Sequence, residues 1–406
     1  MNPAEPFPSK AARWLTFASA ASILFSIAAS QILLALALAA LMMSGEKLQL
    51  PPIKLPLALF LGGTLLALAF SGHAAEGLPQ IRKFYVFCEL LVVYSALRDL
   101  RLIRWLFLVW AGFASITAIR SFVQFGEKVQ KAHELGVSFY TYYIGERITG
   151  FMSHWNTFSA QEMFALIMLG AFLLFGPLSR REWVWIGCAA LMAMAVLLAE
   201  TRMVWIATGV AAVYLAWHWK RWVALALPVA AAVAFLLGPA SLRERATSIA
   251  NPSASDSNAF RWVVWRTGLR MIEAHPLLGL GPEEPHYQFD RYLPADVTEK
   301  PSGWYGHLHN IYLQYAAERG IPVMLILMWM MAKIFLDFWR GLRALPPGRG
   351  YARFLLHGGI AVLLATLTEG FAEYNLGDSE VLTMFLVVVG CGYVALELGE
   401  SKTASA

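Results

Sequence analysis

Residues 14–43 read Trp14-Leu-Thr-Phe-Ala-Ser-Ala-Ala-Ser-Ile-Leu-Phe-Ser-Ile-Ala-Ala-Ser-Gln-Ile-Leu-Leu-Ala-Leu-Ala-Leu-Ala-Ala-Leu-Met-Met43 and contain no charged side chain. The stretch is thirty residues long, about twice the apolar region of a secretory signal peptide. We therefore expect it to remain in the mature protein. It should lie in a membrane, where about 20 apolar residues make one helical crossing.

The composition of the whole chain also favours a membrane protein. Of the 406 residues, 58% are hydrophobic and only 15% are charged, whereas soluble domains carry about 25% charged residues. The net charge of +5 does not indicate nucleic-acid binding, because the basic residues lie in short segments between apolar runs. Cys88, Cys188 and Cys391 stand singly in apolar segments, which argues against a disulfide framework or a Cys-x-x-Cys site.

Ten further apolar segments follow, each about long enough to cross a bilayer. They lie at residues 55–71, 79–97, 102–123, 156–176, 183–199, 202–218, 222–238, 310–336, 353–370 and 380–397. Lys and Arg gather in alternate loops between these segments, and such loops face the cytoplasm. The basic loops contain Lys47 and Lys54; Arg98, Arg101 and Arg104; Arg180 and Arg181; Lys220 and Arg221; and Arg340, Arg343, Arg349 and Arg353.

The same charge pattern indicates how often the first stretch crosses. Lys10 and Arg13 before it and Lys47 after it all belong on the cytoplasmic side, so the chain should cross twice between them. We predict two short helices with a sharp turn near Ser30 and Gln31, and twelve transmembrane helices in all. A single crossing, giving eleven helices, is the alternative.

This topology divides an all-α, polytopic membrane protein into three parts. Residues 1–238 form nine transmembrane helices, and residues 239–308 form a large non-cytoplasmic loop that contains short helices. Residues 309–406 add three transmembrane helices and a cytoplasmic tail. The loop at residues 124–155 emerges on the same side as the large loop, so we expect the chemistry there.

The large loop combines a flexible segment with a helix. Asn251-Pro-Ser-Ala-Ser-Asp-Ser257 is rich in helix breakers and reads as flexible, whereas residues 260–275 show a helical pattern. On a helical wheel Arg266 shares a solvated face with Arg270, and Arg261 heads an otherwise apolar face. We therefore predict that Arg261 points inward.

Several nucleotide and metal motifs are missing from the sequence. It contains no Gly-x4-Gly-Lys-Ser/Thr phosphate loop for ATP-driven transport and no Asp-x-Asp pair for a metal-bound nucleotide sugar. Gly279-x-Gly281 follows no strand and reads as a turn. His307, His309 and His286 lack an acidic or thiol partner at ligand spacing, so we predict no metal and no cofactor.

Two polar residues lie where an apolar run meets the outer side. Arg202 follows Glu200 at the junction of two runs, where burying a cation is unfavourable. It either forms a local ion pair with Glu200 or clamps an anion, and the sequence leaves both open. His309 opens the helix after the large loop; because a helix N-terminus disfavours imidazolium, it is either a neutral proton acceptor or a capping residue.

Four stretches together resemble the O-antigen ligase and polymerase superfamily of bacterial envelope glycosyltransferases. They are Thr201-Arg202; Arg261 with Trp265 and Pro276-Leu-Leu-Gly-Leu-Gly281; His309-Asn310-x-Tyr-Leu-x-x-x-Ala-Glu-x-Gly320; and, more weakly, Arg147-x-x-Gly150-Phe151 through Asn156. Their order and spacing over residues 145–325 carry the resemblance, whereas any single motif is weak. Ligases are the most similar members, since the chain has about their length and one dominant outer loop.

The resemblance implies transfer of O-antigen from undecaprenyl diphosphate to a sugar hydroxyl of lipid A-core, at the periplasmic face of the bacterial inner membrane. Arginine forks would hold the diphosphate without a metal, and a histidine would take the proton of the attacking hydroxyl. A single displacement would then invert the anomeric carbon. The predicted catalytic residues are His309, Arg202 and Arg261, and the predicted substrate-binding residues are Arg147, Arg266 and Asn310. The partners would be the lipid-linked donor, the lipid A-core acceptor and membrane lipids, with the protein acting as a monomer.

Two other functions compete with ligation. An O-antigen polymerase of the same superfamily would share the site and differ in its acceptor, which would be another lipid-linked repeat. A transporter of lipid-linked anions would place its charged groups near the membrane midplane and often shows inverted repeats. The candidate residues here lie at one membrane face and no repeat is evident, which favours an enzyme.

Overall fold

The computed structural model describes residues 6–177, 181–237, 243–245, 247, 257–301 and 303–404. Within these ranges every regular element is a helix and no strand occurs. The first half contains α1 Phe7–Ser22, α2 Ile27–Met43, α3 Lys54–Phe70, α4 Ala74–Arg82, η1 Lys83–Phe87, α5 Cys88–Ala96, α6 Leu100–Glu134, α7 Phe139–Gly145, α8 Trp155–Phe175 and α9 Glu182–Leu198. The second half contains α10 Arg202–Trp219, α11 Arg221–Leu237, α13 Ser257–Ala274, α14 Glu284–Tyr287, η2 Phe289–Tyr292, α15 Ile311–Ala344, α16 Tyr351–Glu369, η3 Asn375–Gly377 and α17 Ser379–Ala404.

The protein is a helical membrane protein with several crossings. Within the described residues, five helices are long and apolar enough to span a bilayer: α6, α8, α15, α16 and α17. The apolar helices α2, α3, α9 and α11 are shorter, so the total of twelve crossings stays a prediction. Each of the ten apolar segments after residue 43 contains helix, but residues 79–97 do not form one continuous helix.

The break in residues 79–97 has a local cause. The segment divides into the end of α4, the 3-10 turn η1 and the short helix α5. Lys83 at the start of η1 donates from Nζ to the carbonyl of Gly377, at 2.7 Å. Gln80 is buried against Glu283 and Arg319. These polar contacts hold α4 and η1 against the segments around Gly377 and Arg319, whereas α5 packs into the apolar core.

The first apolar stretch forms two helices, as predicted, but the turn lies earlier than Ser30 and Gln31. α1 ends at Ser22 and α2 begins at Ile27. Ser26 is extended and its hydroxyl accepts from the amide of Ala29, at 3.2 Å, which caps α2. Ser30 is buried inside α2, where its carbonyl accepts from the hydroxyl of Ser19 on α1, at 2.9 Å. The cap, and not the polar pair, sets the turn.

α15 bends sharply at Gly320, which has a φ of +80°. The segment Pro276–Gly281 packs into this bend: Ile321 donates to the carbonyl of Pro276, at 2.8 Å, and Gly281 donates to that of Glu318, at 2.9 Å. A Cβ atom on Gly320 would lie 2.0 Å from the carbonyl oxygen of Leu277, so only glycine fits. The bend fixes the first part of α15 and, with it, the chain that leads into the helix.

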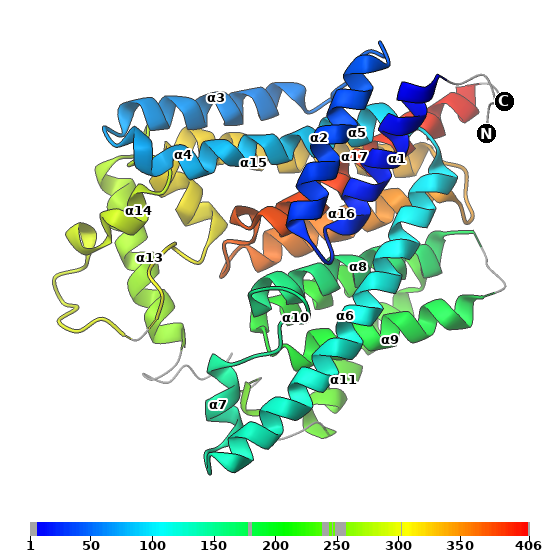
Figure 1. The fold of residues 1–406 in the computed structure, drawn as a ribbon. Helices are drawn as coiled ribbons and strands as arrows, with labels where there is room; N and C mark the ends of the chain where they lie inside the picture. Colours follow the sequence, from blue (N-terminus) through cyan, green and yellow to red (C-terminus); the bar gives the residue numbers. More distant parts are fainter. Residues whose placement is uncertain are drawn as a thin grey trace.

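The part of the large loop that is described packs against one end of the bundle. The start of α1 and the end of α17 lie at one end of the molecule, and α13 and α14 lie at the other (Figure 1). α13 contacts the start of α15 through a small apolar cluster that includes Phe260, Val264, Met271 and Leu308. The predicted helix at residues 260–275 is thus present as α13, whereas most of the stretch read as flexible, Asn251–Ser257, lies outside the described residues.

Candidate active site

A cavity of about 790 Å³ opens at the end of the bundle that carries α13. Its walls come from the start of α8, the start of α10, α13, the chain before α15 and the segment between α16 and α17. Arg147, Arg202, Arg261 and His309, all predicted from the sequence, line it together. Arg245 from the large loop lines it as well. Segments far apart in the chain thus place four guanidinium groups and an imidazole around one space.

The turn before α10 gathers three of these arginines. Glu200 has a φ of +49°, an uncommon conformation for a residue with a side chain, and is buried. Its carbonyl accepts from Nε of Arg245, at 3.0 Å, and from a terminal nitrogen of Arg147, at 3.4 Å. Arg202 begins α10 two residues later and is 5% exposed. The turn therefore fixes three cations on one wall of the cavity.

The positive charge on this wall is concentrated. Burial and the neighbouring charge of Arg245 lower the pKa of Arg147 to about 9, although Glu373 and Glu200 act in the opposite direction. Arg147 is still charged at neutral pH, and its guanidinium lies 4.6 Å from the ring centre of Trp155. Positively charged side chains that are buried close together repel one another, and such an arrangement is expected where an anion binds.

Arg261 points from α13 into the cavity, as the helical wheel predicted, and forms an ion pair with Glu373. Its side chain is 16% exposed. The pair uses one terminal nitrogen, and the buried Nε has no hydrogen-bond partner among the described residues. Because Arg261 lines the cavity and the pair commits only one of its two terminal nitrogens, the second terminal nitrogen is the one that can meet a ligand.

His309 lies on the opposite side of the same carboxylate. Its Nδ1 is buried 3.6 Å from Oε2 of Glu373, and its Nε2 lies 3.3 Å from the carbonyl oxygen of Trp304. The residue has a φ of +46° and stands just before the cap of α15. Its ring also contacts Phe260 edge-on, with ring centres 5.2 Å apart.

Residues 187–328 match the family model described as O-antigen ligase. The match covers about a third of the chain, and this segment is what resembles the O-antigen ligase family. Members of this family are glycosyltransferase-like ligases and polymerases that act on lipid-linked polysaccharides. No curated protein shows a significant match to the chain.

The segment that matches the family model contributes only part of the cavity. Arg202, Arg261 and His309 fall inside the matched residues, whereas Arg147 and Glu373 fall outside them. The rest of the chain is thus needed to complete the cavity walls.

Two residues that the sequence predicted to bind substrate do not line the cavity. Arg266 lies on the solvated face of α13 and pairs with Asp296, at 2.6 Å. Asn310 caps α15 by accepting from the amide of Leu313, at 2.9 Å, and donates to the carbonyl of Phe371, at 2.8 Å. The amide of Asn310 therefore serves to hold α15 against the segment after α16.

The two histidines that raised the question of zinc lie in different surroundings. The Nδ1 of His307 accepts from the amide of His309, at 3.1 Å, and burial lowers the pKa of His307 to about 3. Nδ1 of His286 lies 3.3 Å from the carbonyl oxygen of Tyr305, away from the cavity lining. In the part of the chain that the structure describes, no group of three or more His, Cys, Asp or Glu side chains has metal-binding geometry.

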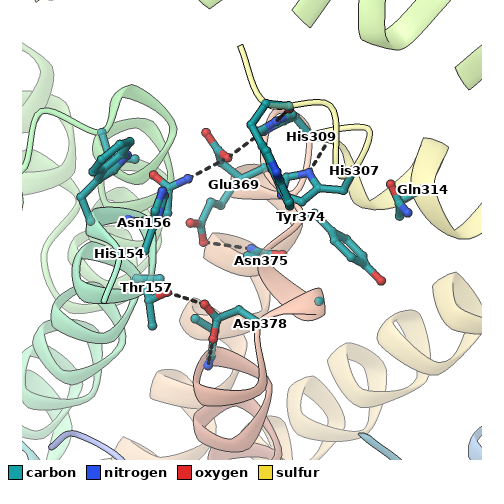
Figure 2. A pocket seen from close by; sticks show the side chains of 18 of the residues that line it. His154, Asn156, Thr157, His307, His309, Gln314, Glu369, Tyr374, Asn375 and Asp378 are labelled. Carbon is teal, nitrogen blue, oxygen red and sulfur yellow. Dashed lines mark hydrogen bonds and ion pairs between the residues drawn. The ribbon is translucent and has the colours of Figure 1, made fainter. Parts of the chain in front are cut away.

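Sequence reasoning missed the acidic segment between α16 and α17. Figure 2 shows Glu369, Asn375 and Asp378 facing the start of α8 across the cavity, where Asp378 accepts from the hydroxyl of Thr157. Glu373 belongs to this segment and is nearly buried. Burial alone would raise the pKa of Glu373, but the charge of Arg261, aided by His309, outweighs burial and lowers it to about 2. The signal was a run of acidic residues between the last two apolar segments, on the predicted outer side.

Proposed function

We propose that the protein is a metal-independent, inverting O-antigen ligase. It would transfer O-antigen from undecaprenyl diphosphate to a sugar hydroxyl of lipid A-core, with residues 239–308 and the cavity on the periplasmic side of the bacterial inner membrane. The observation that carries the proposal is the shared cavity: Arg147, Arg202, Arg245 and Arg261 line it together with His309.

The arginine wall suits the leaving group. Breaking the bond between a sugar and a diphosphate places negative charge on the diphosphate, which needs stabilisation more than protonation. Guanidinium groups supply charge and paired N–H donors in a fixed plane. Arg202 and Arg261 would bind the diphosphate, with Arg147 and Arg245 adding charge from the wall around Glu200.

His309 suits the role of the general base. It lines the cavity beside the arginines, and the acceptor hydroxyl must lose a proton as it attacks. Glu373 is a poor candidate for a covalent nucleophile, because one of its oxygens pairs with Arg261 and the other accepts from Asn156, at 3.0 Å. A single displacement by the acceptor hydroxyl, with inversion, follows from these roles.

The test is a reconstituted reaction. The purified protein, an undecaprenyl-diphosphate-linked glycan and lipid A-core should give a product in which the anomeric configuration of the transferred sugar is inverted, as determined by NMR. His309→Ala should lower the rate by about 10²- to 10⁴-fold, as expected for loss of a general base. A product of retained configuration, or full activity in His309→Ala, would contradict the mechanism.

The acceptor separates ligase from polymerase. If the donor is joined to a second undecaprenyl-linked glycan and not to lipid A-core, the protein is a polymerase with the same site. In cells, loss of a ligase leaves core without polysaccharide, whereas loss of a polymerase leaves a single repeat on the core. Mass spectrometry of lipopolysaccharide from a deletion strain distinguishes the two.

A further inference from the structure

The carboxylate of Glu373 joins three parts of the cavity wall. One oxygen pairs with Arg261 on α13, and the other accepts from Nδ2 of Asn156 at the start of α8, at 3.0 Å. The second oxygen also lies 3.6 Å from Nδ1 of His309. Its side chain is only 7% exposed. A single buried anion therefore touches one of the proposed diphosphate ligands and the proposed base.

The protonation of the His309 ring follows from what faces each nitrogen. An ionised carboxylate can only accept, so a ring nitrogen that faces it is favoured when it carries a proton. Nδ1 is buried and faces Glu373 at 3.6 Å, without a hydrogen bond between them. Nε2 lies 3.3 Å from the carbonyl oxygen of Trp304, which can also only accept. The carboxylate is charged and the carbonyl is neutral, so a neutral ring is favoured with its proton on Nδ1 and its lone pair on Nε2.

Nε2 is also well placed to receive a proton. The carbonyl oxygen of Trp304, 3.3 Å away, can accept from Nε2 once the ring is protonated. After the transfer both ring N–H groups would face acceptors, Glu373 on one side and Trp304 on the other. The imidazolium is stabilised on both sides only while Glu373 is present and charged.

The other ionisable groups around His309 do not supply this negative charge. His307 lies on the same segment, and His154 faces it from the chain before α8; burial lowers the pKa of both. Arg261 on α13 is a cation and forms an ion pair with Glu373. Among these neighbours, Glu373 is the anion.

We propose that Glu373 is the positioning residue of the transfer: it keeps the proton of His309 on Nδ1 and holds Arg261 toward the diphosphate. This inference rests on the proposed function. The acceptor oxygen forms its bond to the anomeric carbon while the bond from that carbon to the diphosphate oxygen breaks. The hydroxyl proton passes to Nε2 of His309, and the electron pair leaves with the undecaprenyl diphosphate, whose charge the arginines stabilise.

The first experiment needs no transfer activity. Full-length protein labelled with ¹⁵N-histidine is observed by NMR, and His309→Ala identifies the His309 signals by their loss. The parent should carry the ring proton on Nδ1, and Glu373→Gln, whose side-chain amide can donate, should shift it toward Nε2. A proton on Nε2 in the parent, or no change in Glu373→Gln, overturns the proposal even if the protein is an active ligase.

The second experiment measures the pH dependence of glycan transfer. Glu373→Gln should lower turnover by at least about 10²-fold and move the acid limb of the profile to lower pH, because the imidazolium loses its anion. Glu373→Asp keeps the charge on a shorter side chain, so turnover should fall while the limb stays in place. A uniform loss in Glu373→Gln, with the limb unmoved, overturns the positioning role.

Glu283→Gln is the matched control. Glu283 also lines the cavity, but its carboxylate accepts from Gln80 and not from His309. This variant should leave both the His309 signals and the pH profile unchanged. If the parent shows the Nδ1 proton and the shift in Glu373→Gln but transfers no glycan, the proposed function fails while the role of Glu373 in holding His309 stands.

Discussion

Two arginine–glutamate pairs of the described residues differ in their relation to the cavity: Arg261 and Glu373 line it, whereas Arg319 and Glu318 do not. Arg319 pairs with Glu318 on α15; the side chains are 3% and 0% exposed. All three nitrogens of Arg319 are used, since Nε donates to Thr64, at 3.0 Å, and the terminal nitrogens donate to Glu318 and Gln80. Arg261, by contrast, pairs with Glu373 through one nitrogen and keeps a buried Nε without a partner among the described residues.

The comparison shows that burial of an ion pair does not by itself indicate a functional site. The pair at Glu318 and Arg319 lies next to the bend at Gly320, and the carbonyl of Glu318 accepts from Gly281. That pair stabilises a fold feature. The pair at Arg261 lines the cavity and commits only one of the two terminal nitrogens, and this difference in hydrogen bonding separates the two roles.

The largest expected difference between the two pairs is catalytic. Arg261→Lys keeps the charge but loses the planar fork, so transfer should slow by about 10²- to 10³-fold, the usual loss when one preorganised donor at a developing charge is removed. The ratio kcat/KM for the lipid-linked donor is the measurement. A lysine variant within about threefold of the parent would show that paired donors at this position do not matter.

Breaking the pair of Glu318 and Arg319 should lower the free energy of unfolding. Arg319→Met leaves Glu318 as a buried charge without its partner, which typically costs about 3–5 kcal/mol. Unfolding of the purified protein in detergent measures this loss. The double variant Glu318→Gln with Arg319→Met removes both charges and should recover much of it. If the single and double variants unfold alike, the pair is not an energetic unit.

The sequence predicted the parts of this comparison that depend on local periodicity. Arg261 was placed on the inward face of its helix because the helical wheel depends only on residue spacing. In the structure Arg261 lines the cavity, and Trp265 and Ile272 of the same face pack against the apolar cluster of α13. The start of α15 after His309 was likewise predicted by the transition from polar loop to apolar run.

Long-range partners could not be predicted in this way. Glu373 follows Arg261 by 112 residues in the chain, so no local spacing connects them. Arg245 meets the carbonyl of Glu200 only because the turn before α10 has a left-handed residue. The turn between α1 and α2 was misplaced for a different, local reason, since the cap at Ser26 outweighed the pair Ser30 and Gln31.

Acid should weaken the cavity pair. The pKa of Glu373 is lowered to about 2 from its ordinary 4.5, so its ionised form adds stability above about pH 4.5 that is lost as the pH falls toward 2. Since one pKa unit corresponds to about 1.4 kcal/mol, the full effect is about 3 kcal/mol. Unfolding between pH 6 and 3 should show a steeper loss in the parent than in Glu373→Gln. Parallel curves would mean that the pairing does not lower this pKa.

Two exposed tryptophans allow a smaller test of which surface meets the acceptor. Trp304 and Trp262 are both 62% exposed, but only Trp304 lines the cavity. Aromatic rings pack against the apolar faces of ligands in binding sites. Trp304→Ala should therefore raise the KM for lipid A-core by about fivefold, as expected for about 1 kcal/mol, whereas Trp262→Ala should not. Equal effects of the two variants would indicate a shared role at the membrane surface instead.

The smallest effect is expected five residues along α13 from Arg261, at Arg266. Its guanidinium pairs with Asp296 on the exposed face of the helix, where solvent screens the interaction. Arg266→Ala should leave the KM for the donor within about twofold of the parent, and Asp296→Asn, which breaks the same pair from the other side, should match it. A large rise in KM for Arg266→Ala alone would mean that the donor extends over the outer face of α13. The cavity would then be only part of the binding surface. The contrast between Arg261 and Arg319 in how many guanidinium nitrogens form hydrogen bonds would no longer be sufficient to locate the whole donor site.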